Sequence, residues 1–148
     1  MLTQTAEYAL RAVLYLAERP ELGPVRVGDV ADALDVPQNY LSKILHVLTR
    51  QGILSSLRGP HGGFQLARDP RKLRLFDVVR HFDELSSQRR CVLGRPQCSD
   101  ENPCGAHDRW KPVATRITAF FRETTVADAL ASARRKGLSA AGGEVPLA

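Results

Sequence analysis

The sequence predicts a mainly α-helical fold with one small β-hairpin. Three observations carry this prediction: apolar residues repeat at helical spacing in several segments, two short extended runs flank a Gly-rich turn, and all cysteines fall in one loop. The chain has 148 residues, of which 43% are hydrophobic and 25% charged. These values are typical of a folded domain rather than a disordered chain.

The first half of the chain predicts three helices, over residues 5–18, within residues 27–36 and over residues 37–52. Val36 precedes a proline and is biased away from helical backbone, so a short turn separates the second helix from the third. Pro37 suits the first turn of the third helix, where a missing N–H costs nothing. Two helices joined in this way suggest a helix-turn-helix.

Two short extended runs follow, on either side of the turn at residues 59–63. A helix-turn-helix followed by a hairpin is a winged helix-turn-helix, and the hairpin is its wing. Later segments predict a helix within residues 73–85, a long helix over residues 108–124 whose aromatic face is too large to leave exposed, and a last short helix that Thr125 could cap. We therefore divide the chain into a winged helix-turn-helix domain (1–85), a cysteine-rich loop (86–107), a long and a short helix (108–136) and a disordered tail (137–148).

Positive charge is concentrated in the middle of the chain. Residues 37–75 hold seven Lys or Arg and one acid, an excess of +6 that exceeds the net charge of +5 for the whole chain. Neutralisation of phosphates supplies much of the affinity of a protein for DNA, so this excess favours double-stranded DNA as a partner. The alternative is a solvated polar helix face and an ordinary hairpin.

The polar face of the third helix could read a major groove, and the wing could enter a minor groove. Tyr40 has two open roles, a contact to phosphate or packing beneath its helix. The candidate DNA-contacting residues are Gln38, Asn39, Tyr40, Ser42, Lys43, His46, Arg50, Arg58 and His61.

The sequence predicts a cytoplasmic protein with no membrane partner. No window reaches the roughly 18 apolar residues of a membrane helix. Glu7 and Arg11 interrupt the apolar positions of the first helix, unlike those of a signal peptide. Because cytoplasmic thiols stay reduced, clustered cysteines there indicate metal or redox chemistry more often than disulfides.

All three cysteines and a histidine fall in the stretch CVLGRPQCSDENPCGAH, residues 91–107, with the spacing C-x6-C-x5-C-x2-H. Structural zinc sites usually pair their ligands as C-x2–4-C. The wider gaps here suit a loop wrapped around a larger group, such as an iron–sulfur cluster bound through thiolates. A zinc site and a thiol-based redox switch remain open alternatives. Asp100 and Glu101 are expected to be polar loop residues rather than ligands.

The order of the elements and this loop together resemble the IscR/NsrR-type family of bacterial winged-helix transcriptional regulators. The resemblance covers roughly residues 1–137, and its specific pieces are LTQTAEYALRAVLYLA, SLRGPHGGFQLARDP and CVLGRPQCSDENPCGAHDRW. It implies a homodimer in which the long helix is the dimerisation helix. It also implies that Cys91, Cys98 and Cys104 bind an iron–sulfur cluster.

The resemblance offers two candidates for the fourth ligand. In IscR-like members a histidine three residues after the last cysteine completes a two-iron cluster, and His107 stands at that position. In NsrR-like members a carboxylate in the first helix of the partner subunit completes a four-iron cluster, and Glu7 stands at the matching position. The first cysteine gap is one residue longer than in the IscR-like pattern, so both candidates stay open. The C-x2-H step and the following Trp110 favour His107 and two irons.

Without a cluster, His107 would cap the long helix or face solvent, and Glu7 would be an exposed helix residue. With a cluster, the chain would be a dimeric repressor whose affinity for a near-palindromic operator follows the state of the cluster. Oxygen, nitric oxide or iron shortage would be its signals. The sequence has no paired carboxylates, no Ser-His-Asp spacing and no nucleotide-binding loop, so we expect neither an enzyme nor a small-molecule substrate.

Overall fold

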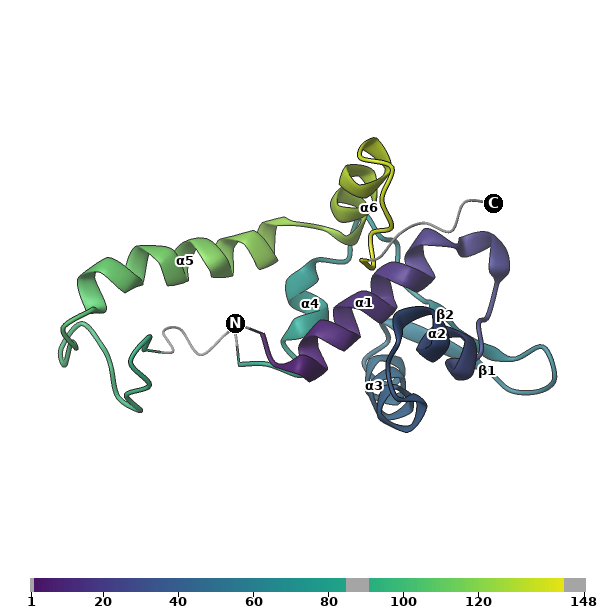
Figure 1. Cartoon of the computed structure of the whole chain (residues 1–148), viewed down its shortest axis with the longest axis horizontal. Helices are drawn as coiled ribbons and strands as arrows, with labels where there is room; N and C mark the ends of the chain where they lie inside the picture. Colours follow the sequence, from purple (N-terminus) through teal and green to yellow (C-terminus); the bar gives the residue numbers. More distant parts are fainter. Residues whose placement is uncertain (1, 85–90, 143–148) are drawn as a thin grey trace.

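The structure is a computed structural model, and it describes residues 2–84 and 91–142. It is mainly helical with one two-stranded antiparallel sheet, as predicted (Figure 1). Among the described residues, no helix is both long and apolar enough to cross a membrane. The elements are α1 (Gln4–Glu18), the 3-10 turn η1 (Pro20–Leu22), α2 (Val27–Leu34), α3 (Gln38–Arg50), β1 (Leu54–Leu57), β2 (Gly63–Leu66), α4 (Leu75–Val79), α5 (His107–Glu123) and α6 (Val126–Arg135).

The central helix of the fold is α1. Thr3 caps it, because its side-chain oxygen accepts a hydrogen bond from the N–H of Ala6. Four of the six residues on its buried stripe are alanines, which let neighbouring elements approach closely. Helices α2, α3, α4 and α6 and strand β2 all pack against α1. The buried stripe consists of Ala6, Ala9, Ala12, Val13, Leu16 and Ala17.

The predicted helix-turn-helix is confirmed in α2 and α3. Asp35 ends α2 in the left-handed conformation (φ 52°), and the N–H of Val36 donates to the carbonyl of Ala31. Pro37 then occupies the N-cap of α3, one position before the helical turn to which the sequence assigned it. The side chains that α3 buries are Leu41, Ile44, Leu45 and Leu48.

The two strands form the predicted wing. They pair in antiparallel register, with Leu54 opposite Leu66. Val25 pairs with Phe64 of β2, so the segment before α2 braces the wing. Only glycine fits at position 63, because its φ is +151° and a Cβ there would lie 2.3 Å from the carbonyl oxygen of Val25.

Helix α4 is shorter than the helix expected within residues 73–85. It covers only Leu75–Val79, after which the N–H of Asp83 donates to the carbonyl of Val79. The carboxylate of Asp83 accepts a 2.7 Å hydrogen bond from the N–H of Thr3 at the start of α1. This long-range bond turns the chain away from a longer helix and ties the segment that follows α4 to the start of α1.

Helix α5 projects from the body of the fold and carries the cysteine loop at its far end (Figure 1). The helix runs through Pro112, beyond the first turn in which a proline is best tolerated. Val113 is 47% exposed and Phe120 is 54% exposed. A single chain therefore does not cover the face that the sequence marked as too apolar to expose.

Helix α6 begins at the predicted cap, Thr125. The Thr125 hydroxyl accepts from the N–H of Asp128, and the Asp128 carboxylate accepts from the N–H of Thr125. The helix packs against α1, so it belongs with the DNA-binding unit and not with the projecting part of α5.

The predicted disorder of the tail is wrong for residues 137–142. Ala141 is 3% exposed, and the Ser139 hydroxyl donates a 3.0 Å hydrogen bond to the carboxylate of Glu18 in α1. Small side chains allow this segment to lie flat on α1, a long-range contact that local composition does not reveal. The rest of the predicted tail, residues 143–148, lies outside the described residues.

Candidate DNA-reading face and metal centre

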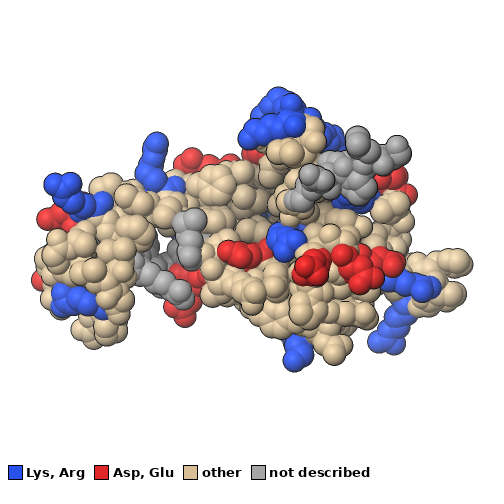
Figure 2. All heavy atoms as spheres, viewed as in Figure 1, with Lys and Arg blue, Asp and Glu red and all other residues tan. Residues whose placement is uncertain are grey.

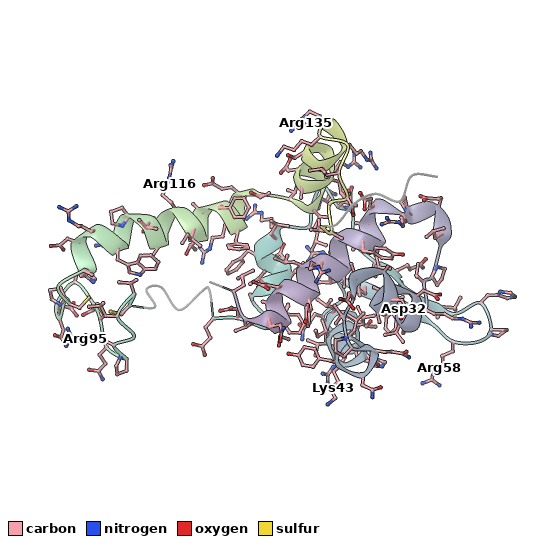
Figure 3. The ribbon with its side chains drawn as sticks, viewed as in Figure 1. Asp32, Lys43, Arg58, Arg95, Arg116 and Arg135 are labelled. Atoms are coloured by element: carbon pink, nitrogen blue, oxygen red, sulfur yellow. The ribbon has the colours of Figure 1, made fainter. Side chains whose placement is uncertain are left out.

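Two cations mark the candidate DNA-reading face. Lys43 of α3 and Arg58 of the wing both point away from the body along the lower edge of the molecule (Figure 3). Acidic side chains gather instead over α2 (Figure 2), where Asp29, Asp32 and Asp35 are exposed. The face that suits a polyanion therefore comprises α3 and the wing and excludes α2.

Most of the candidate DNA-contacting side chains are exposed on this face. Ser42 is half-buried, and the ring of His46 meets that of Phe64 edge-on, with centroids 5.6 Å apart. The recognition helix α3 therefore touches the wing through His46. The exposed candidates are Gln38, Asn39, Tyr40, Lys43, His46, Arg50, Arg58 and His61.

Tyr40 is turned toward α1. Its hydroxyl is hydrogen-bonded to the hydroxyl of Thr5, and its ring meets that of Tyr8 edge-on with centroids 5.8 Å apart. Tyr40 therefore packs against α1, yet 38% of the residue remains exposed, so a contact to phosphate stays a prediction. Tyr40 ties the start of the recognition helix to the start of α1.

Three of the cations counted between residues 37 and 75 lie elsewhere. Arg71, Lys72 and Arg74 line a groove together with Arg122, close to where α5 ends and α6 begins. Arg71 is also ion-paired with Asp69 at 2.9 Å. The charge excess that the sequence assigned to one surface is therefore divided between two.

The three cysteine sulfurs meet at the free end of α5. All three Sγ atoms lie within 4.8 Å of one another, and those of Cys91 and Cys104 are 3.4 Å apart. No other group of three Cys, His, Asp or Glu ligands is as close within residues 2–84 and 91–142. Cys91 is buried, and Cys98 and Cys104 are partly exposed.

Local turns fold the loop around these thiols. Gly94 has a φ of 72°, and its N–H donates a 2.8 Å hydrogen bond to the carbonyl of Cys91, which closes a turn behind the first thiol. The N–H of Asn102 donates to the hydroxyl oxygen of Ser99, which closes a second turn between the other two cysteines. The wide cysteine gaps thus hold the turn residues that bring the thiols together.

The thiols differ in acidity. The backbone N–H of Arg95 lowers the pKa of Cys91 to about 7, against the effect of burial and with help from the thiol of Cys104. At Cys98 the backbone N–H of Cys104 favours the thiolate, but burial and the two neighbouring thiols outweigh it and raise the pKa. Cys91 therefore supplies a thiolate near neutral pH more readily than Cys98 does.

His107 joins the thiols to a carboxylate. Its side chain is 5% exposed, with Nδ1 3.2 Å from Sγ of Cys98 and Nε2 2.8 Å from Oδ1 of Asp100. Lys111, one turn further along α5, donates to both carboxylate oxygens of Asp100, at 2.9 and 2.8 Å. His107 thus lies beside the Cys98 thiol rather than in solvent.

Sequence reasoning missed the roles of Asp100 and Lys111. Both are polar residues in a polar stretch, and only the fold brings them to His107. Glu7, the alternative ligand, is exposed in the first turn of α1, and neither Glu7 nor His107 belongs to the group of ligand atoms within 4.8 Å of one another. Three thiols and an imidazole whose second nitrogen is held by a carboxylate form a donor set that fits an iron–sulfur cluster, and also zinc.

Comparison with known proteins identifies the family. The profile of the Rrf2 family, described as an iron-dependent transcriptional regulator, matches residues 2–132. The chain belongs to the Rrf2 family. A putative HTH-type transcriptional regulator of Aquifex aeolicus is 36% identical over 129 residues, which are 85% of this chain and 88% of that protein. The HTH-type transcriptional regulator IscR of Escherichia coli is 31% identical over 127 residues, which are 86% of this chain and 78% of IscR.

Solved structures agree with this Rrf2 assignment. T. potens IscR has a TM-score of 0.72 at 25% identity and covers 93% of this chain and 91% of its own. CymR, the global cysteine regulator of B. subtilis, has a TM-score of 0.73 at 18% identity over 89% of this chain and 97% of its own, and shows the fold alone. The chain is thus a DNA-binding transcriptional regulator of IscR type with a winged-helix fold, and it is not an enzyme.

Proposed function

We propose that this Rrf2 regulator controls its operator through an iron–sulfur cluster held by Cys91, Cys98, Cys104 and His107. The observation that carries the proposal is the meeting of three thiol sulfurs within 4.8 Å of one another at the end of α5. Its relatives include IscR, and its family is described as iron-dependent. A bound cluster would supply a centre whose oxidation state and integrity respond to the redox condition of the cell.

His107 is the preferred fourth ligand, which favours a two-iron cluster. The preference is supported by the 3.2 Å distance between its Nδ1 and Sγ of Cys98. The alternative is a four-iron cluster completed by the partner subunit's Glu7. The exposed position of Glu7 on α1 is compatible with that alternative, so the iron count decides between them.

A homodimer is the form in which we propose the regulator acts. The apolar face of α5 is the surface that supports this, because Val113 and Phe120 are about half exposed in the single chain. Pairing through α5 would place two α3 helices on one DNA duplex. A twofold dimer then requires a near-palindromic operator with half-sites one or more helical turns apart.

Contacts within the described residues connect the end of the α4 region, α1 and α3. Asp83, which lies just beyond α4, is bonded to Thr3 at the start of α1. In turn, α1 is bonded to α3 through Thr5 and Tyr40. We propose that the state of the loop acts on the direction of α3 through these contacts. A coupling free energy of about 1–3 kcal/mol between the state of the loop and DNA binding, equal to roughly a 5–150-fold change in operator affinity, would be enough for regulation.

Metal analysis of the full chain purified without oxygen tests the cofactor. Near-equal iron and sulfide with visible absorption is the expected result, with two irons per subunit for His107 and four for Glu7. Cys98→Ser should lose the iron, while Gln97→Ala, a substitution at the exposed neighbouring position, should keep it. Colourless protein that contains zinc, or no metal, contradicts the proposal.

A thiol switch is the second candidate function. It is favoured by the 3.4 Å separation of the Cys91 and Cys104 sulfurs. Two thiols and one hydrogen peroxide would give a disulfide and two waters. Metal-free protein treated with peroxide should then lose two of its three thiols, and the cross-linked peptides should contain Cys91 and Cys104. Loss of all three thiols, or of none, speaks against this switch.

A further inference from the structure

We infer that Asp100 and Lys111 form a positioning pair that fixes the tautomer and direction of His107, so that its Nδ1 faces the thiols as a ligand. The inference deepens the proposed function and rests on it for the identity of the bound group. It concerns residues outside the ligand set, and it assigns a role to a carboxylate that the spacing of the cysteines does not mark.

The hydrogen bonds of His107 determine its tautomer. An ionised carboxylate can only accept hydrogen bonds, so the 2.8 Å contact between Oδ1 of Asp100 and Nε2 of His107 places the proton on Nε2. Nδ1 of the neutral ring then carries a lone pair. That lone pair lies on the side of Cys98, whose sulfur is 3.2 Å away. The arrangement therefore presents a bare nitrogen to the thiol group.

Lys111 keeps the carboxylate in place. It donates to both oxygens of Asp100, so the carboxylate cannot rotate away from the imidazole without losing two charge-assisted bonds. His107 and Lys111 are four positions apart on α5 and so lie on one face of the helix. The pair thus pins the loop between Cys98 and Cys104 onto the N-terminal end of α5.

The chemistry of such a pair is general. A ligating histidine that donates its other N–H to a carboxylate is held in one orientation and becomes a stronger donor, and loss of that partner typically costs about 10–100-fold in metal affinity. In this chain the pair spans from solvent to the interior, because Lys111 and Asp100 are 43% and 51% exposed while His107 is 5% exposed.

Binding of Co²⁺ to metal-free protein without oxygen tests the pair, since cobalt absorption reports on thiolate and imidazole ligands. Asp100→Ala should weaken Co²⁺ binding by about 10–100-fold. Asp100→Asn keeps an oxygen acceptor and should recover most of the affinity. The control Glu101→Gln removes a carboxylate from the adjacent exposed position and should behave as wild type.

A second readout uses the cluster-loaded protein. Asp100→Asn removes a negative charge one hydrogen bond away from the ligand, so the reduction potential should rise although the cluster stays bound. Glu101→Gln makes the same change of charge without the contact to His107 and should leave the potential near that of wild type. If Asp100 had only a structural role, Asp100→Asn and Glu101→Gln would have the same reduction potential.

A third readout needs no metal. In metal-free protein with ¹⁵N-labelled histidine, at a pH where imidazoles are neutral, His107 should carry its proton on Nε2, and Asp100→Ala should allow both tautomers. The inference is overturned if His107 of Asp100→Ala keeps the wild-type tautomer and the variant binds Co²⁺ as tightly as wild type. If wild-type protein takes up no iron–sulfur cluster but Asp100→Ala still weakens Co²⁺ binding, the cluster proposal fails and the positioning pair stands.

Discussion

The N–H of Thr3 donates a 2.7 Å hydrogen bond to the carboxylate of Asp83, across 80 positions of the chain. The hydroxyl of Thr3 also donates to the carbonyl of Phe82, at 3.2 Å. One residue therefore caps α1 and holds the segment that follows α4. Since Asp83 is only 6% exposed, water cannot readily replace this bond.

Asp83→Ala is expected to lower the free energy of unfolding by about 1–3 kcal/mol, the usual result of leaving a buried donor without its charged partner. Asp83→Asn keeps one acceptor oxygen and should cost less. Urea unfolding of the two variants beside the wild type measures both values. Equal stability of Asp83→Ala and wild type would show that this bond does not hold the segment.

Lys43→Ala is expected to weaken binding to all DNA sequences alike, because Lys43 lies where phosphates would pass along α3. The slope of log K against log salt should fall by about 1. Arg135→Ala is the matched control, since Arg135 is a cation at the tip of α6, on the side away from Lys43 (Figure 3). Equal losses of affinity in both variants would contradict the proposed reading face.

Phe120→Asp is expected to separate the proposed dimer into monomers, because it places a charge on the exposed apolar face of α5. Thr115→Asp puts the same charge on the opposite side of α5 and should leave the dimer intact. Light scattering coupled to size-exclusion chromatography gives the mass of each. A Phe120→Asp dimer that is as stable as wild type would rule out this face as the interface.

Acid is expected to weaken the start of α6. The N–H and then the hydroxyl of Thr125 lower the pKa of Asp128 below its ordinary value of 3.8. A lowered folded-state pKa means that the ionised carboxylate stabilises the fold above pH 3.8, and that this contribution disappears as the pH falls toward the lowered pKa. Asp128→Asn should therefore show a smaller loss of stability in acid than wild type, as measured by thermal unfolding across that range. An equal loss of stability in acid for Asp128→Asn and wild type would contradict this role of Asp128.

Much of the fold could be predicted because its signals are local. Thr125 predicts the cap of α6, and the turn before Pro37 predicts the helix-turn-helix. The glycines of the turn also predict the wing. The need for glycine at position 63, however, comes from the close approach of Val25, which lies far away in the sequence and leaves no local signal. The length of α4 was wrong because Asp83 is bonded to Thr3, and the order of residues 137–142 was missed because those residues pack on α1.

The candidate metal centre, too, could be predicted only in part from the sequence. Spacing and residue type predicted that Cys91, Cys98 and Cys104 act together, and the structure brings their sulfurs within 4.8 Å. Spacing alone did not reveal Asp100, because a carboxylate in a loop is usually a solvated group. Its role depends on the direction of the His107 ring and on the position of Lys111 one turn along α5.

Operator affinity with and without the cluster is the most direct test of the account. DNA selected from a random library would be titrated without oxygen with cluster-loaded protein and with the same preparation after chelation. The account predicts about a 5–150-fold difference in affinity between the two forms, with an unchanged dimer. Equal affinities for the same operator would contradict it and would leave the three cysteines without a part in regulation.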